Sequence, residues 1–210
     1  MSRRVTSIDL LRGLVIVIMA IDHTRDFVNA AAMNFQPEDL ARTTPAIFFT
    51  RWITHVCAPV FMFCAGLGAA LRFQRDHSHS DLSRFLWTRG LWLILLEVTL
   101  VRLGFFFNVK YDLVFLLVFW AIGLSMIALA FLSRLPGRLL LVVGVALIAL
   151  HNLLDGVKAA SFGSWAWIWN VLHQPGMVTT SPPVILIGYP VLPWIGVMAL
   201  GFCEIGRAHV

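Results

Sequence analysis

The chain has 210 residues, of which 59% are hydrophobic and only 13% are charged, and its mean hydropathy is +0.83. Soluble domains are about 45–50% apolar and about 25% charged, so this composition excludes an ordinary soluble domain and predicts an integral membrane protein. The net charge of +5 does not indicate a nucleic-acid-binding protein, because the basic residues lie mainly in short gaps between apolar runs, as in membrane loops.

Apolar runs of about 20 residues predict membrane-spanning helices. We therefore expect an all-α, polytopic transmembrane bundle of about six spanning helices, forming a single domain over residues 1–203. Pro190 and Pro193 interrupt the last span, and the tryptophan-rich piece Ser161–His173 is typical of a helix lying in the membrane interface. The expected spans are roughly Ile8–Phe27, Ile53–Phe73, Phe85–Phe107, Leu113–Leu132, Leu139–Leu154 and Val184–Cys203.

Lysine and arginine positions predict the orientation, because loops on the cytoplasmic side carry more of them. A cytoplasmic N-terminus places the larger set inside and leaves the longer connectors, residues 28–51 and 155–183, outside. The inner set is Arg3, Arg4, Arg72, Arg75, Arg84, Arg89, Arg134 and Arg138, and the outer set is Arg25, Arg42, Arg51, Lys110 and Lys158.

Both ends of the chain invite another interpretation. Two arginines, an apolar run and three alanines resemble a signal peptide, but Asp9 and Arg12 interrupt the apolar run, which favours a retained helix. The heptapeptide EIGRAHV, residues 204–210, resembles the translation of a common sequencing adapter. We therefore expect residues 204–210 to be an artefact and the natural domain to continue beyond residue 203.

Ionisable residues inside a span cost about 2.5–3.5 kcal/mol on insertion scales, so they indicate a functional site or a structural pair. Asp9 and Arg12 lie three residues apart at the inner edge of the first span, where they can pair or contact a phosphorylated cofactor. Glu97 lies in the middle of the third span, and a partner on another helix is expected for it.

The stretch IDHTRDF ends the first span with Asp22, His23, Arg25 and Asp26. Asp22 and Asp26 share one helix face, while His23 points about 100° away. A carboxylate beside an imidazole raises its basicity and suits a general base, although a polar helix end explains the same residues.

Polar residues also mark the outer ends of three other spans, so a pocket can form between four helices. Within it, Asn152 could donate to an oxyanion, and two histidines, at positions 23 and 55, could act as acid and base. The residues expected in this pocket are Asp22, His23, Asp26, Arg51, His55, Arg102, His151, Asn152 and Asp155.

The metal-binding signals are weak. The sequence contains no HExxH or HxxxH pattern and no zinc-type cysteine spacing, so no metal is expected. Cys57 and Cys64 would lie about 10 Å apart on one helix, too far for a disulfide.

Several segments together resemble bacterial members of the heparan-α-glucosaminide N-acetyltransferase catalytic-domain family. The resemblance runs from about Ser7 to Phe202, and its most specific parts are SIDLLRG near the N-terminus and the APVF…AG segment of the second span. Other similar segments are TRGLWLILLEVTLV, FWAIGLSMIALAFL, LPGR, ALIALHNLLDG and LPWIGVMALGF.

The resemblance implies a transmembrane acyltransferase. In lysosomal relatives, acetyl-CoA in the cytosol donates its acetyl group to the amine of a terminal glucosamine on the far side, and an intramembrane histidine takes part. Here the donor would enter near Asp9 and Arg12, and the acceptor would enter from outside. A histidine between them would deprotonate the amine or take the acetyl group itself.

Two positions depart from the family pattern. The relatives carry the catalytic histidine in the outer loop before the second span, but residues 28–51 contain none, and His23 and His55 are the nearest substitutes. The relatives also place a functional asparagine near the end of the first span, where this chain has Asp22 and His23. We choose His23 as the first candidate.

The leading hypothesis is therefore an acyltransferase of the bacterial inner membrane that acts on an extracytoplasmic glycan or other amine or hydroxyl acceptor. Membrane lipids and the acceptor are the expected partners, nucleic acid is not, and a homodimer is one option. The alternatives are a proton-coupled small-solute transporter, in which Glu97 carries protons, and a scaffold protein with structural ion pairs.

Overall fold

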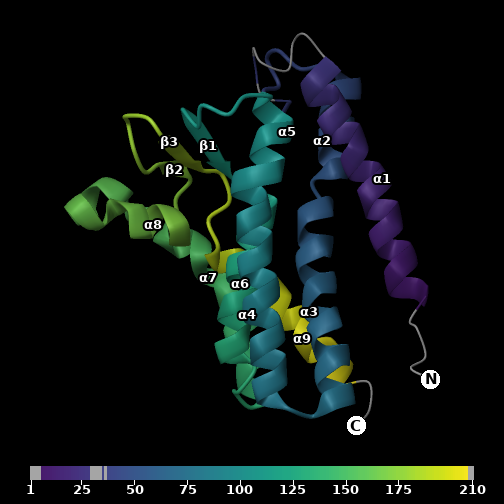
Figure 1. The fold of residues 1–210 in the computed structure, drawn as a ribbon. Helices are drawn as coiled ribbons and strands as arrows, with labels where there is room; N and C mark the ends of the chain where they lie inside the picture. The colour runs from purple at the N-terminus through teal and green to yellow at the C-terminus, as the bar shows by residue number, and fades with distance from the viewer. Residues whose placement is uncertain (1–5, 29–34, 36, 208–210) are drawn as a thin grey trace. The chain divides into compact units, whose positions relative to one another are not determined.

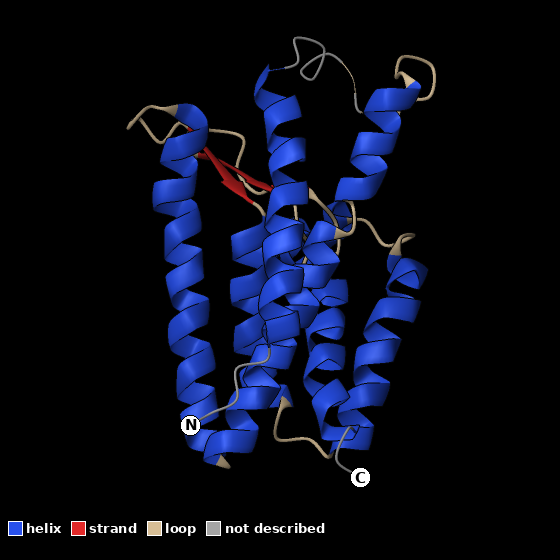
Figure 2. Ribbon diagram, turned by 90° about the vertical axis from the view of Figure 1, so that its right-hand side faces the viewer, coloured by secondary structure: helices blue, strands red, loops and turns tan. Residues whose placement is uncertain are grey.

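The computed structural model describes residues 6–28, 35 and 37–207. The chain divides into two compact units, residues 1–64 and residues 65–210, and each is considered by itself. Helices dominate the described residues, and the strands among them form one small sheet (Figure 2).

Unit 1 contains α1 (Thr6–Val28), α2 (Pro45–Thr54) and the beginning of α3 (Cys57–Asp76). Thr44 caps α2 by accepting a hydrogen bond from the backbone N–H of Ile47 at 3.4 Å, and Pro45 suits the first helical turn. The sequence predicts a continuous span over 53–73, but the helix breaks between α2 and α3. Pro59 explains the break, because proline has no N–H to continue the helical ladder back to residue 55.

Two contacts attach α1 to α3 within unit 1. The Arg12 guanidinium donates a hydrogen bond to the backbone oxygen of Cys64 at 2.7 Å, and the Cys57 thiol lies 3.7 Å from the backbone oxygen of Val15. Cys57 and Cys64 are both buried and free, as their spacing predicts.

In unit 2 the expected third span is one long rod made of α4 (His79–Leu96), a π-helical turn η1 (Glu97–Val101) and α5 (Arg102–Phe106). It packs against α6 (Val118–Leu132) through Gly90 and Gly123, and a Cβ on either glycine would lie 2.6 Å from the other's backbone oxygen. Small residues allow such close approach of helix backbones, which is how helices associate in membranes.

A second glycine contact joins α7 (Gly137–Leu150) to α9 (Leu192–Arg207). A Cβ on Gly196 would lie 2.7 Å from the backbone oxygen of Gly144. A 3₁₀ turn, η2 (His151–Leu154), ends α7, so the helix expected for the fifth span is present with a tighter last turn.

A small sheet was not expected from the sequence. It consists of β1 (Leu113–Leu116), β2 (Gly176–Met177) and β3 (Val184–Ile187), in the order β1-β3-β2, with β1 and β3 parallel and β2 antiparallel to β3. It lies beside η1 and α5 (Figure 1). The sequence predicts that the apolar runs of β1 and β3 belong to the fourth and sixth spans, because a short apolar run does not distinguish a strand from a buried helix.

The remaining elements are η3 (Ala159–Trp165) and α8 (Ala166–Leu172), which occupy the tryptophan-rich piece predicted to be helical. Trp165 and Trp167 are exposed, as an interfacial helix requires.

By length and composition, two stretches of helix are long and apolar enough to cross a membrane, namely Pro45–Asp76 and Gly137–Leu154. Two further apolar helices, Val118–Leu132 and Leu192–Glu204, are shorter. The predicted helical class is confirmed, whereas the number of six spans, the cytoplasmic N-terminus and the single domain over 1–203 stay predictions.

Candidate functional site

The carboxylate of Asp22 is the centre of a polar network in unit 1. It accepts hydrogen bonds from Arg51 Nη1 at 2.8 Å and from Thr54 Oγ1 at 2.7 Å, and Arg25 Nη1 lies 2.8 Å from it. The side chain of Asp22 is only 15% exposed. One carboxylate thus fixes two guanidinium groups and attaches the end of α1 to α2.

Arg51 also binds a second carboxylate. Its Nε donates to Oε1 of Glu38 at 3.0 Å. Partial burial opposes ionisation of Glu38, but the hydrogen bond and the charge of Arg51 outweigh it, so the pKa of this carboxyl lies below its ordinary value. Arg51 is therefore held between two anionic groups.

His55 stands next to this pair with its ring orientation fixed. Its Nδ1 lies 3.1 Å from the backbone oxygen of Arg51, so Nδ1 carries a proton and donates it to that carbonyl. The other nitrogen, Nε2, lies 3.9 Å from Oε1 of Glu38. An imidazole held in this way presents Nε2 for proton transfer.

A cavity of about 610 Å³ adjoins these groups within unit 1. It combines a guanidinium, a carboxylate and an imidazole with aromatic and aliphatic faces, which is typical of small-molecule sites. Its lining residues are Glu38, Phe48, Arg51, Trp52, His55, Val56, Pro59 and Val60.

The other predicted residues of unit 1 lie around this network. His23 is exposed on α1, one residue beyond Asp22, and the side chain of Asp26 lies outside the described residues. Asp9 is exposed near the start of α1, while Arg12 is half-buried and donates to Cys64. Two of the residues predicted for the pocket, Asp22 and Arg51, are therefore in direct contact, and Glu38 and Thr54 join them.

In unit 2, Arg102 is 3% exposed and holds the loop that follows α5. Its guanidinium donates to the backbone oxygen of Leu113 at 3.2 Å, and to both the backbone oxygen and the side-chain oxygen of Asn108. These contacts give Arg102 a structural role.

Glu97 is 2% exposed and caps another helix. Its carboxylate accepts a hydrogen bond from the backbone N–H of Trp120 at 3.0 Å, in the first turn of α6. An anionic group at a helix N-terminus satisfies unpaired N–H groups and complements the helix dipole. The expected partner of Glu97 on another helix is therefore the backbone of α6.

The structure brings together only some of the polar residues that were predicted to cluster at the end of α7. Asn152 is exposed, and His151 Nδ1 lies 2.7 Å from the backbone oxygen of Ile148. Asp155 pairs with His173, whose Nε2 lies 3.0 Å from Asp155 Oδ1. His173 is not among the site residues that the sequence predicts, because its position 18 residues beyond Asp155 follows no helical spacing and depends on the fold of η3 and α8.

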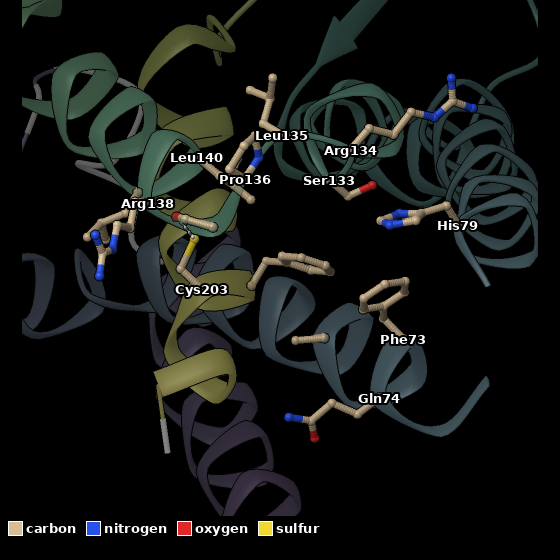
Figure 3. A pocket seen from close by; sticks show the side chains of 14 residues that line it. Phe73, Gln74, His79, Ser133, Arg134, Leu135, Pro136, Arg138, Leu140 and Cys203 are labelled. Atoms are coloured by element: carbon tan, nitrogen blue, oxygen red, sulfur yellow. Dashed lines mark hydrogen bonds between the residues drawn. The ribbon is translucent and has the colours of Figure 1, made fainter. Parts of the chain in front are cut away.

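Unit 2 also contains a cavity of about 830 Å³ that is lined by the end of α3, the connector after α6, the beginning of α7 and part of α9. Its apolar lining residues include Phe73, Leu140 and Phe202. Arg134 and Arg138 extend in different directions at its edges (Figure 3). The connector after α6 belongs to the side predicted to be cytoplasmic.

Across residues 6–28, 35 and 37–207, no three histidine, cysteine, aspartate or glutamate side chains lie close enough together to hold a metal ion.

Comparison with known proteins gives one match. A model of the family described as "Heparan-alpha-glucosaminide N-acetyltransferase, catalytic" matches residues 4–208, nearly the whole chain. No curated protein and no solved structure matches the chain.

Proposed function

This chain belongs to the heparan-alpha-glucosaminide N-acetyltransferase catalytic family, and from that membership we propose that it is an integral membrane acyltransferase. It moves an acetyl group from cytoplasmic acetyl-CoA to the amine or hydroxyl of an extracytoplasmic glycan or similar acceptor. The match over residues 4–208 is the observation that carries this proposal. A bacterial inner membrane is the proposed location, and a homodimer is the proposed assembly.

The residues that line the cavity in unit 1 are suited to binding a polar acceptor. Arg51 is fixed by Asp22 and Glu38, so its guanidinium is preorganised for the oxygen atoms of a sugar. Trp52 and Phe48 line the same cavity and offer flat apolar faces against which a sugar ring can pack.

A histidine is proposed to act on the acceptor or to carry the acetyl group. His23 is the first candidate, because it adjoins Asp22 on α1. His55 is the second, because it lines the cavity with Nδ1 hydrogen-bonded to a backbone carbonyl and Nε2 available. Both belong to unit 1.

The donor is proposed to bind on the cytoplasmic side. Asp9 and Arg12 lie at the predicted inner end of α1, where the guanidinium of Arg12, which also donates to the backbone oxygen of Cys64, is proposed to contact a phosphate. In unit 2, the cavity bordered by Arg134 and Arg138 has an apolar interior and basic edges, which suits the pantetheine and phosphate groups of acetyl-CoA.

A proton-coupled transporter is the second proposal, and the proline break before α9 favours it, since transporters use interrupted helices. Its proposed proton carrier is Glu97. The hydrogen bond from the α6 backbone offers a structural reason for burying this carboxylate, and so the acyltransferase remains the first proposal.

The test uses inside-out membrane vesicles that contain the protein and radiolabelled acetyl-CoA. The acyltransferase proposal predicts labelled protein or labelled luminal glycan with the wild type, and none with His23→Ala at equal membrane insertion. Full labelling by His23→Ala removes His23 from the mechanism. No label with any variant, together with solute uptake that is lost in Glu97→Gln, would favour the transporter.

A further inference from the structure

Two acceptor atoms lie close to each other in the cavity of unit 1. One is Oε1 of the Glu38 carboxylate. The other is Nε2 of His55, which carries a lone pair in the neutral ring, since Nδ1 donates its proton to the backbone oxygen of Arg51. The two atoms are 3.9 Å apart, which is too far for a hydrogen bond. Both side chains line the cavity and are about half exposed, so a ligand can reach them.

Arg51 holds both acceptors in place. Its Nε donates to Oε1 of Glu38 at 3.0 Å, and its backbone oxygen accepts from Nδ1 of His55 at 3.1 Å. Arg51 is itself fixed by Asp22, which accepts from its Nη1 at 2.8 Å. The carboxylate and the imidazole are therefore positioned before a ligand arrives, and such preorganisation lowers the entropic cost of binding.

The separation of the two acceptors selects the kind of group that can lie between them. Because 3.9 Å is less than the length of two hydrogen bonds of about 2.9 Å, one ligand atom can reach both Oε1 of Glu38 and Nε2 of His55. A primary amine carries at least two hydrogens, whether it is protonated or not, and can donate one to each acceptor. A hydroxyl carries only one hydrogen, so it would cover one acceptor without giving it a donor, which costs free energy.

The rest of the cavity also suits a nitrogen that carries a positive charge. Among the described lining residues, Glu38 is the acidic one and Arg51 is the basic one, and the charge of Arg51 is met by both Asp22 and Glu38. Trp52 lines the same cavity, and an indole ring attracts a cation more strongly than the other aromatic side chains do.

We propose that Glu38 determines which acceptor the cavity of unit 1 takes. Together with Nε2 of His55 it forms a two-acceptor site for a primary amine, and it discriminates against a hydroxyl at the same position. This inference rests on the proposed acyl transfer, which allows either an amine or a hydroxyl acceptor. It gives Glu38 a role in binding only, and it holds whichever histidine acts on the bound acceptor.

The test compares two sugars that differ only at carbon 2, where glucosamine carries an amine and glucose a hydroxyl. The purified full chain in lipid nanodiscs is titrated with each sugar by calorimetry without acetyl-CoA, and acetyl transfer to glucosamine is then measured with radiolabelled acetyl-CoA. The wild type is expected to bind glucosamine about tenfold or more tightly than glucose, which is the contribution of one hydrogen bond to a charged group.

Two variants assign that difference to Glu38. Glu38→Gln keeps the size of the side chain and removes its charge, so it should weaken glucosamine binding and raise the KM for glucosamine about tenfold. Glucose binding and the KM for acetyl-CoA should not change. Asp39→Asn is the matched control, because it removes the same charge one residue away, at a side chain that pairs with Arg42 and does not line the cavity. It should behave as the wild type does.

Wild-type protein that binds glucose as well as glucosamine, or binds neither, would overturn the inference, and this comparison holds even if Glu38→Gln does not insert into the membrane. An equal loss of both sugars in Glu38→Gln would overturn it too, since a purely structural role predicts that result. The same is true of equal effects in Glu38→Gln and Asp39→Asn, which would indicate a general attraction of cations. Binding of glucosamine that depends on Glu38, without acetyl transfer, would support the amine site and contradict the proposed function.

Discussion

At the scale of single residues, Asp22 is the acceptor around which the polar network of unit 1 is arranged. Three donor side chains meet its carboxylate, and the residue itself is mostly buried. The sequence predicts this role only in part. The i, i+4 spacing of Asp22 and Asp26 indicates a polar helix face, but no spacing rule connects position 22 with positions 51 and 54, which come from another helix.

Replacing Asp22 by alanine should therefore destabilise unit 1. Arg51 and Arg25 would remain as partly buried cations without this carboxylate, and breaking such a pair typically costs about 3 kcal/mol. Thermal unfolding in detergent measures the effect. Asp39→Ala is the matched control, because Asp39 pairs with exposed Arg42 on the surface and should change the midpoint little. Equal midpoints for the two variants would contradict the role of Asp22.

Glu38 gives a prediction about pH. Its pKa in the folded protein lies below the ordinary value of 4.5, so its ionised form stabilises the fold. That stabilisation is fully present above the ordinary value and is lost as the pH falls through the lower, folded value. The unfolding midpoint of the wild type should thus decrease more below pH 4.5 than that of Glu38→Gln. Parallel curves for the two proteins would show that the Arg51 contact does not favour the carboxylate.

At the scale of secondary-structure elements, glycine contacts explain how α4 packs on α6 and how α7 packs on α9. Hydropathy identifies these four helices, since each is an apolar run, and the structure confirms them. Hydropathy does not identify which helices pack against each other, because each contact depends on which helix face the glycine occupies after folding. The strands β1 and β3 were missed for a related reason. Their apolar composition suits a strand and a membrane helix equally, and only the parallel pairing of Leu113 with Val184 distinguishes them.

Gly90→Ala tests the α4–α6 contact. The new Cβ would lie 2.6 Å from the backbone oxygen of Gly123, so the two helices must separate, at a typical cost of about 1–3 kcal/mol. Gly104→Ala in α5 is the matched control, because a Cβ there meets no atom within 4 Å. We expect a lower unfolding midpoint for Gly90→Ala alone. A midpoint equal to that of the control would mean that the two helices do not pack this closely.

The cap that Glu97 supplies to α6 can be tested in the same way. Glu97→Ala removes the acceptor for the backbone N–H of Trp120, and a buried donor without a partner costs about 1–3 kcal/mol. Glu97→Gln keeps an acceptor oxygen and should recover most of the lost stability. If both variants are equally destabilised, the charge of Glu97 rather than its hydrogen bond supports α6.

At the scale of the whole molecule, composition alone predicts the membrane class, and the motifs of the first two spans predict the family that the family match confirms. The site follows less completely from the sequence. Polar residues at helix ends are visible in the sequence, and some of them meet, as Asp22 and Arg51 do. Others, such as Arg102, form hydrogen bonds with a neighbouring loop instead. His173 contacts Asp155 because of the way η3 and α8 fold, and no periodicity in the sequence predicts that fold.

Acetyl transfer across a membrane is the central claim, and sealed proteoliposomes test it most directly. Purified protein would be inserted with its cytoplasmic side outward, with glucosamine trapped inside and radiolabelled acetyl-CoA added outside. The proposal predicts labelled N-acetylglucosamine inside the vesicles with the wild type and none with His23→Ala. Inserted wild-type protein that forms no such product, or forms it only when both substrates are on the same side, would contradict the proposal.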